Sequence, residues 1–198
     1  MTTVTTTTAA AAPQADRGDW IATYSGLPFW PMSPKPEDVR IDDIAHALSQ
    51  LCRFAGHTRA FYSVAQHSVL VSLLCDPQDA LWGLLHDAPE AYLCDLASPV
   101  KRTPLLSGYR VLEAHVQIAV ARKFGLPIRI PASVKAADTV LLRTEQRDLM
   151  RMPQGWAVPP PAMPHRIVAQ TPEEAKARFL LRFDELMAAR PSDADLRA

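Results

Sequence analysis

The chain has 198 residues, of which 48% are hydrophobic, and its 21 basic and 21 acidic residues leave a formal net charge of zero. This length and apolar content are sufficient for one sizeable hydrophobic core. A protein that binds polymeric nucleic acid would carry a basic stripe, so the balanced charge argues against such a partner. The sequence has no run of 18 apolar residues and no basic, apolar leader, so we expect neither secretion nor a membrane partner.

The first elements in chain order are a tail and an extended segment. Residues 1–18 are rich in Thr and Ala, and we expect them to form a disordered N-terminal tail. Residues 20–30 alternate enough to predict a short hairpin or an extended arm. Helical periodicity follows in segments that mostly begin beside an acidic residue or a proline. The predicted helices span residues 41–53, 61–75, 77–88, 104–124, 131–151 and 172–190.

Six helices joined by short links predict an all-α bundle with an extended or hairpin N-terminal arm, in one domain over residues 19–190. Residues 152–165 hold five prolines in fourteen positions, so we expect an extended surface loop rather than a domain boundary. Residues 191–198 are polar and predict a flexible C-terminal tail. Three cysteines without CxxC spacing favour reduced thiols and a cytoplasmic location.

Two ionisable residues lie on apolar helix faces. His67 shares its face with apolar residues at positions −3, +3, +4 and +7, and Asp138 with apolar residues at −4, +3 and +4. Burying a carboxylate in this way is costly unless its charge is compensated. A divalent cation is the simplest compensator.

The segment LLHDAPEAYLCD adds four further ionisable residues directly after an apolar run. His86 and Asp87 are adjacent, Glu90 follows after three residues, and Asp95 after five more. Pro89 cannot donate a backbone hydrogen bond, so we expect the helix that carries His86 to kink or end here. Two imidazoles and two carboxylates suit Zn²⁺, Mn²⁺, Co²⁺ or Fe²⁺ better than Ca²⁺, which prefers oxygen ligands.

The order His, His-Asp, Asp resembles the HD superfamily of metal-dependent phosphohydrolases. The blocks SVAQHS, HDAPEAYLCDLASPVK and KAAD are similar to those of its 5′-deoxynucleotidase branch and of relatives that hydrolyse deoxynucleoside triphosphates, including viral dATP triphosphohydrolases. The matching blocks cover about residues 53–138. The resemblance implies an HD-domain helical bundle and a hydrolase of nucleotide metabolism.

The resemblance also implies roles for single residues. The implied metal ligands are His67, His86, Asp87 and Asp138. Glu90 would assist the attacking water, Arg53 would bind phosphate, and Asp95 would read the sugar 3′-hydroxyl. Phe54 would pack on the nucleoside, where the family usually has Trp, and the spacing from Arg53 to the first metal histidine differs by about one residue. Apart from the resemblance, the ammonium group of Lys101 would add a point charge for the phosphate.

Three functions follow as alternatives. Hydrolysis of a deoxynucleoside 5′-monophosphate is the leading one. Release of triphosphate from a deoxynucleoside triphosphate is the second, and it would use Mg²⁺ or a second ion and the cations Arg59, Lys101 and Arg102. The third is a non-catalytic nucleotide-binding regulator, against which an intact Glu90 argues. In each case the partner is a small deoxynucleotide, and we expect a homo-oligomer, a dimer or higher.

Simpler interpretations stand beside the metal ligands and the proton carrier. His67 taken alone fits a hydrogen-bonded core histidine, and Asp138 fits a buried residue paired with Arg143 or Lys135. The His-Asp pair fits an ordinary helix C-terminus with a favourable cation. Glu90 and Asp95 fit plain surface carboxylates.

Three further residues have competing interpretations. Arg53 fits a helix C-terminal cation, and Phe54 fits core packing as well as base contact. Glu145 lies seven residues after Asp138 and shares its helix face, so it can orient a ligand or bind a second ion. A salt bridge of Glu145 near Arg143 or Arg147 is the preferred interpretation.

Overall fold

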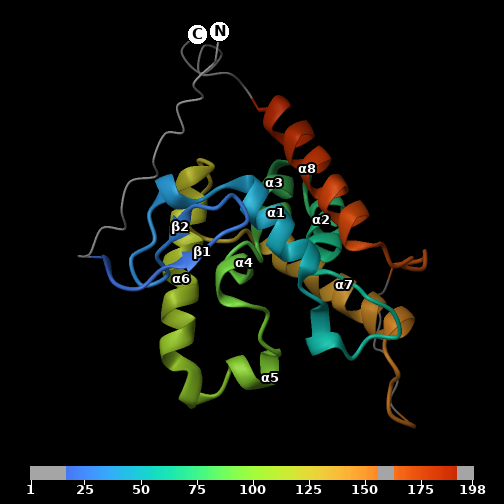
Figure 1. Ribbon diagram of the computed structural model, residues 1–198. Coiled ribbons are helices and arrows are strands. Elements are labelled where there is room, and N and C mark those ends of the chain that lie inside the picture. Colours follow the sequence, from blue (N-terminus) through green and yellow to red (C-terminus); the bar gives the residue numbers. More distant parts are fainter. Residues whose placement is uncertain (1–16, 156–162, 191–198) are drawn as a thin grey trace, which may run out of the picture.

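The computed structural model describes residues 17–155 and 163–190, and these are mostly helical (Figure 1). The prediction of an all-α fold is therefore confirmed. The helices are α1 Ile41–Gln50, α2 Val64–Leu74, α3 Ala80–Leu85, α4 Glu90–Leu93, α5 Ser98–Lys101, α6 Ser107–Lys123, α7 Ala132–Leu149 and α8 Pro172–Ala188. Single 3₁₀ turns are formed by Pro36–Asp38, Arg53–Gly56, Pro77–Asp79 and Pro104–Leu106.

The predicted N-terminal hairpin is present. Strand β1, Ile21–Ala22, pairs antiparallel with β2, Pro28–Phe29. The hairpin is anchored to the helices because the buried ring of Phe29 stacks on that of Tyr92 in α4, with ring centroids 3.8 Å apart. The hairpin thus packs against α4, the helix that follows the His-Asp pair.

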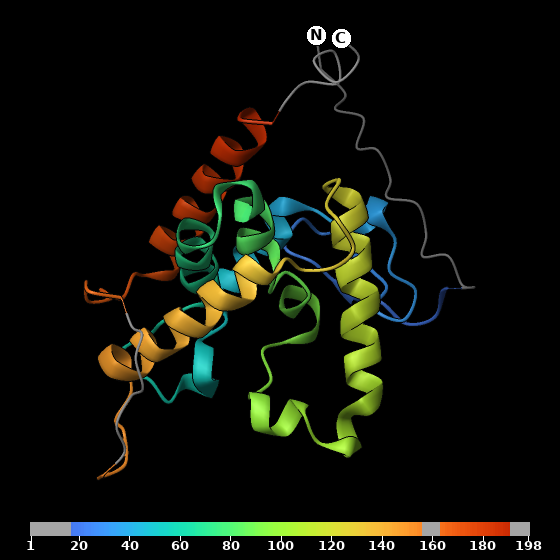
Figure 2. The ribbon, with the colours of Figure 1, turned by 180° about the vertical axis from the view of Figure 1, so that it is seen from behind.

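Helix α2 lies at the centre of the bundle and packs against α1, α3, α7 and α8. In both views α6 stands on the opposite side of the molecule from α8, with α4 and α5 between α6 and α7 (Figures 1 and 2). Helix α3 approaches α2 closely at Gly83, where a Cβ atom would lie 2.8 Å from both Cys75 Sγ and the Cα atom of Ser72. This close contact sets the distance between α2, which carries His67, and α3, which His86 directly follows.

Two helices begin at capping residues. The Ser63 hydroxyl accepts a hydrogen bond from the Gln66 backbone at 3.1 Å and starts α2, so the helix predicted over 61–75 begins three residues later than expected. Thr171 starts α8 through a capping box with Glu174.

The region after α3 differs most from the predicted elements. The helix expected over 77–88 consists of a 3₁₀ turn and the short α3, which ends at Leu85. Helices α4 and α5 were not predicted. Helix α4 ends at Leu93, because Cys94 has a φ of 69°, outside the helical region. A segment this short cannot show a periodic apolar pattern in the sequence.

The expected tails lie largely outside the described residues, which exclude 1–16 and 191–198, and so does the middle of the proline-rich loop, 156–162. Arg17, predicted to be in the N-terminal tail, is instead held against the domain by an ion pair with Asp38 and by the face of Trp30, 4.0 Å away. All three cysteines are free thiols. No described helix has the length and apolar character that a membrane span requires.

Candidate metal centre

The centre of the candidate site is His67, on the buried face of α2. Its Nδ1 lies 2.7 Å from Glu145 Oε1, an acceptor on α7. Its Nε2 therefore faces the opposite way, toward the segment that follows α3. There it lies 3.3 Å from His86 Nε2 and 3.6 Å from Asp87 Oδ2.

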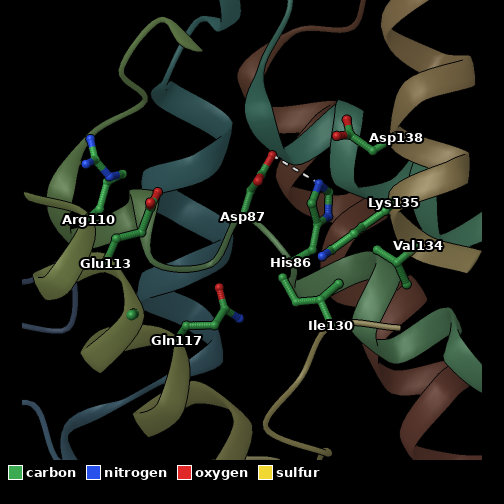
Figure 3. A pocket seen from close by; sticks show the side chains of 10 residues that line it. His86, Asp87, Arg110, Glu113, Gln117, Ile130, Val134, Lys135 and Asp138 are labelled. Carbon is green, nitrogen blue, oxygen red and sulfur yellow. Dashed lines mark ion pairs between the residues drawn. The ribbon is translucent and has the colours of Figure 1, made fainter. Parts of the chain in front are cut away.

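The break after α3 orients the His-Asp pair. His86 donates from Nδ1 to the backbone carbonyl of Gly83 at 2.8 Å, which leaves the lone pair of Nε2 for the site. That Nε2 lies 3.2 Å from Asp87 Oδ2 (Figure 3). The predicted interruption is confirmed, since α3 ends at Leu85 and α4 begins only after Pro89.

The ligand atoms of His67, His86 and Asp87 all lie within 4.8 Å of one another. Asp138, from α7, lies beside this group, with Oδ1 3.3 Å from His67 Nε2, but its side chain is 44% exposed and sits at the rim. Two imidazole nitrogens and a carboxylate, with a second carboxylate adjacent, fit a divalent transition metal. The outward nitrogen of each imidazole is already bound to a protein acceptor, as in metal sites of known proteins.

Electrostatics favour the charged forms of His67 and Asp87. Burial and Arg53 act to lower the pKa of His67, but Glu145 and Asp138 outweigh them and raise it to about 9. Although burial acts against it, the neighbouring imidazoles and guanidinium hold the pKa of Asp87 well below its ordinary value. The site is therefore an ion-pair cluster in which a cation must displace a proton from His67.

Glu90 lies at the start of α4 and is only 5% exposed, so its interpretation as a surface acid is wrong. Its Oε1 lies 3.5 Å from Lys101 Nζ, and its Oε2 has no hydrogen-bond partner among the described residues. Burial, followed by the charges of Asp87 and Asp95, raises the pKa of Glu90 to about 10. At neutral pH it is a buried carboxylic acid that is able to donate a proton.

Two cavities meet at Asp138. The first, which we call the Phe54 cavity, has a volume of about 500 Å³, and its walls include Arg53, Phe54, Asp95, Arg102, Gln146 and Asp138. The second, the α6–α7 cavity, has a volume of about 330 Å³ (Figure 3). Its walls include His86, Asp87, Arg110, Glu113, Lys135 and Asp138. The α6–α7 cavity therefore borders the candidate metal group at His86 and Asp87, whereas the Phe54 cavity borders it at Asp138.

Arg53 and Phe54 are held at the site by a strained turn. Phe54 and Ala55 have φ values of 55° and 49°, in the left-handed region that residues with a Cβ atom rarely adopt. Arg53 is 13% exposed and donates to Asp87 Oδ2 at 3.4 Å. Since α1 already ends at Gln50, the interpretation of Arg53 as a helix C-terminal cation is wrong. Phe54 lines the Phe54 cavity rather than the core.

The other expected cations differ in placement. Lys101 forms an ion pair with Glu113 at 2.5 Å and lies 3.5 Å from Oε1 of the protonated Glu90, so its charge is directed at Glu113. Arg102 lines the Phe54 cavity and is exposed. Arg59 lies on an exposed loop segment, where its backbone N–H bonds to Leu149. Asp95 is half-buried on the wall of the Phe54 cavity, where burial raises its pKa.

The main residue that sequence reasoning misjudged is Glu145. It is fully buried and contacts His67 and Arg53, while Arg147 pairs with its neighbour Asp148 at 2.7 Å. The preferred interpretation was a salt bridge near Arg143 or Arg147. Its pairing with Arg147 is wrong, and the ion pair that the structure shows for Glu145 is with Arg53. Its spacing of seven residues from Asp138, two helical turns, was the signal that placed both on one face.

The chain is similar to two curated bacterial proteins. It is 40% identical over 176 residues to the uncharacterized protein YfdR of Escherichia coli, a match that covers 86% of this chain and 97% of that protein. It is 35% identical over 188 residues to the uncharacterized protein RCAP_rcc00048 of Rhodobacter capsulatus, with 85% and 95% coverage. No family model matches the chain. The similarity extends over nearly the whole length of both relatives.

Proposed function

The chain belongs to the family of YfdR and RCAP_rcc00048, and we propose from its site that it is a metal-dependent phosphohydrolase of deoxynucleotides. The observation that carries the proposal is the convergence of His67, His86 and Asp87 beside the buried acid Glu90. The order of these residues along the chain supports a place in the HD superfamily. The adjoining Phe54 cavity supports a nucleotide as substrate.

The residues that would hold the ion are His67, His86, Asp87 and Asp138. Their donor set suits Zn²⁺, Mn²⁺, Co²⁺ or Fe²⁺. Such an ion, when bound, makes water more acidic and stabilises negative charge on phosphoryl oxygens. Because Asp138 lies half-exposed at the rim, its side chain can change position when the ion and the substrate bind.

Glu90 would carry out the proton transfers. Its carboxyl group is protonated at neutral pH, and its Oε2 has no hydrogen-bond partner within residues 17–155 and 163–190. It can therefore give its proton to the leaving 5′-oxygen and take one from the attacking water in the same cycle. Lys101 holds the other oxygen and fixes the orientation of Glu90. We therefore assign Lys101 to the support of Glu90 rather than to the phosphate.

The substrate itself would be bound by the walls of the Phe54 cavity. The guanidinium of Arg53 offers parallel donors to a phosphate once it exchanges one carboxylate partner. The ring of Phe54 provides an apolar face for the nucleoside, and Asp95 an acceptor for a sugar hydroxyl. Since Lys101 is paired with Glu113, this cavity offers fewer cations than a triphosphate needs, which favours a 5′-monophosphate.

The decisive experiment is product analysis. Protein loaded with Mn²⁺, Co²⁺ or Zn²⁺ is incubated with deoxynucleoside mono- and triphosphates and with the matching ribonucleotides. We expect inorganic phosphate from the deoxynucleoside monophosphates and none from metal-stripped protein. Triphosphate release from the deoxynucleoside triphosphates would move the chain to the second substrate class. Binding without turnover of any substrate would overturn the proposal in favour of a nucleotide-binding regulator. The homo-oligomer and the cytoplasmic location stay predictions.

A further inference from the structure

We propose that Glu145 is a positioning residue that ties the metal-binding His67 to the phosphate-binding Arg53, so that the two halves of the site are assembled by one carboxylate. The part that concerns phosphate rests on the proposed function. The part that concerns the metal does not need a substrate. Glu145 itself touches neither the ion nor the reacting atoms.

The geometry of Glu145 assigns one oxygen to each partner. It is fully buried in the middle of α7, where an unpaired carboxylate would be very costly. Oε1 accepts from His67 Nδ1 at 2.7 Å, and Oε2 accepts from Arg53 Nη2 at 3.3 Å. One buried side chain therefore connects α2 with the strained turn after α1.

The contact with His67 determines which ring nitrogen is offered to an ion. Because Nδ1–H donates to Glu145, Nε2 is the nitrogen that faces His86 and Asp87. A carboxylate on the outer nitrogen fixes the ring and makes the inner one a stronger ligand. Loss of this contact would leave the ring free to turn within its pocket.

The contact with Arg53 keeps a phosphate-binding group in place. In this structure the guanidinium is shared between Asp87 and Glu145, at 3.4 Å and 3.3 Å. Asp87 Oδ2 is the same oxygen that faces His86 Nε2, so a cation there competes with Arg53 for it. Glu145 then remains as the anchor of Arg53, while Nη1 becomes available to a phosphate oxygen.

The test uses Glu145→Gln, which keeps the size of the side chain and removes its charge. Mn²⁺ affinity is measured on the full chain by electron paramagnetic resonance, without substrate. Affinity for inorganic phosphate is measured by calorimetry on the Mn²⁺-loaded protein. We expect Mn²⁺ to bind about 10- to 100-fold more weakly and phosphate on the order of tenfold more weakly. Asp43→Asn is the matched control, because Asp43 is also a buried carboxylate but lies away from the metal group and accepts hydrogen bonds from the backbone and hydroxyl of Ser25.

A double mutant separates positioning from general damage. In an Arg53→Ala background, Glu145→Gln should no longer change phosphate affinity, yet should still weaken Mn²⁺ binding through His67. A purely structural role would shift both affinities equally in both backgrounds, and that result would overturn the inference. If Glu145→Gln does not fold, Glu145→Asp replaces it, since the shorter carboxylate cannot reach both partners.

The outcomes distinguish this inference from the proposed function. Wild-type protein that hydrolyses deoxynucleotides, with Glu145→Gln binding Mn²⁺ and phosphate as tightly as wild type, overturns the inference alone. Wild-type protein without any turnover, with Mn²⁺ binding weakened by Glu145→Gln, overturns the proposed function and supports the role of Glu145 at the metal site.

Discussion

The carboxyl group of Glu90 is kept protonated by its surroundings rather than by its sequence neighbours alone. It is buried, one of its oxygens is without a hydrogen bond among the described residues, and the pKa is raised to about 10. A group of this kind is a proton donor at neutral pH, and the loss of a proton from it requires a nearby positive charge.

We predict that Glu90→Gln keeps its metal and loses turnover. The amide has nearly the same shape and, like the protonated acid, no charge, so folding and Mn²⁺ content should be unchanged. Without a transferable proton, kcat should fall by about 10²- to 10⁴-fold. Steady-state kinetics and metal analysis of the same sample check this. Asp138→Ala should instead lose both metal and turnover, and equal activity of either variant to wild type would contradict the assigned roles.

The protonation of His67 predicts a pH dependence of metal binding. Its pKa is raised to about 9, so the metal-free protein holds this proton at neutral pH and an ion must displace it. Mn²⁺ affinity should therefore increase by up to about tenfold per pH unit below pH 9. The raised pKa also stabilises the metal-free fold fully below the unfolded value of 6.5, and this contribution is lost as pH rises through 9.

Mn²⁺ titrations from pH 6.5 to just above pH 9 measure this effect, because this range includes both the ordinary pKa of His67, 6.5, and its raised pKa of about 9. His165→Gln is a suitable control, because His165 is exposed and should leave the pH profile unchanged. An affinity that does not vary over this range would contradict the protonated state of His67.

The turn after α1 is the element in which function and backbone strain coincide. Three consecutive residues, Phe54, Ala55 and Gly56, have positive φ values, and they fold the chain so that Arg53 reaches the metal group. Only the last of them is a glycine. The left-handed conformation costs a residue with a Cβ atom roughly 1–2 kcal/mol, so packing elsewhere must offset it.

We predict that Ala55→Gly stabilises the protein. Ala55 is exposed and has a φ of 49°, so glycine removes the clash at no loss of packing. The free energy of unfolding should rise by about 0.5–1 kcal/mol after the entropy cost of glycine. Urea denaturation measures it. The control is Ala136→Gly on the exposed face of α7, which should destabilise by about 1 kcal/mol. A decrease of equal size in both variants would contradict the strained turn.

Residues from separate parts of the bundle meet at the candidate site. His67 comes from α2, His86 and Asp87 from the turn after α3, and Asp138 from α7. These segments also pack together, chiefly around the central α2. An ion that binds the folded state and not the unfolded chain therefore stabilises the entire bundle.

We predict that Mn²⁺ raises the melting temperature. At a free concentration of 100 times Kd the gain is about 2.7 kcal/mol, which corresponds to roughly 5–10 °C for a chain of this size. Thermal unfolding with Mn²⁺, with EDTA and with Ca²⁺ checks this, and EDTA should reverse the shift. His67→Ala should show none. The same small shift with Ca²⁺ and with Mn²⁺ would contradict a site built on two imidazoles.

The helical class, the hairpin and the break beside the candidate site were predictable because each is encoded by local pattern. Helical periodicity placed His67 on a buried face, and the proline after the His-Asp pair predicted the break that the structure contains. Asp138 was expected to be buried on an apolar face as well, but its side chain is 44% exposed because it lies at the rim of the site. The short helices α4 and α5 were not predictable, since four residues are too few to show a period.

The sequence by itself determined which side chains are available to bind an ion and on which helix faces they lie. Only the tertiary structure decided that Glu145 contacts His67 and Arg53, that Lys101 pairs with Glu113, and that two cavities share one aspartate in their walls. The physical reason is distance along the chain. Periodicity and capping act within a few residues, whereas Glu145 and His67 are 78 positions apart and meet only because α2 and α7 pack together.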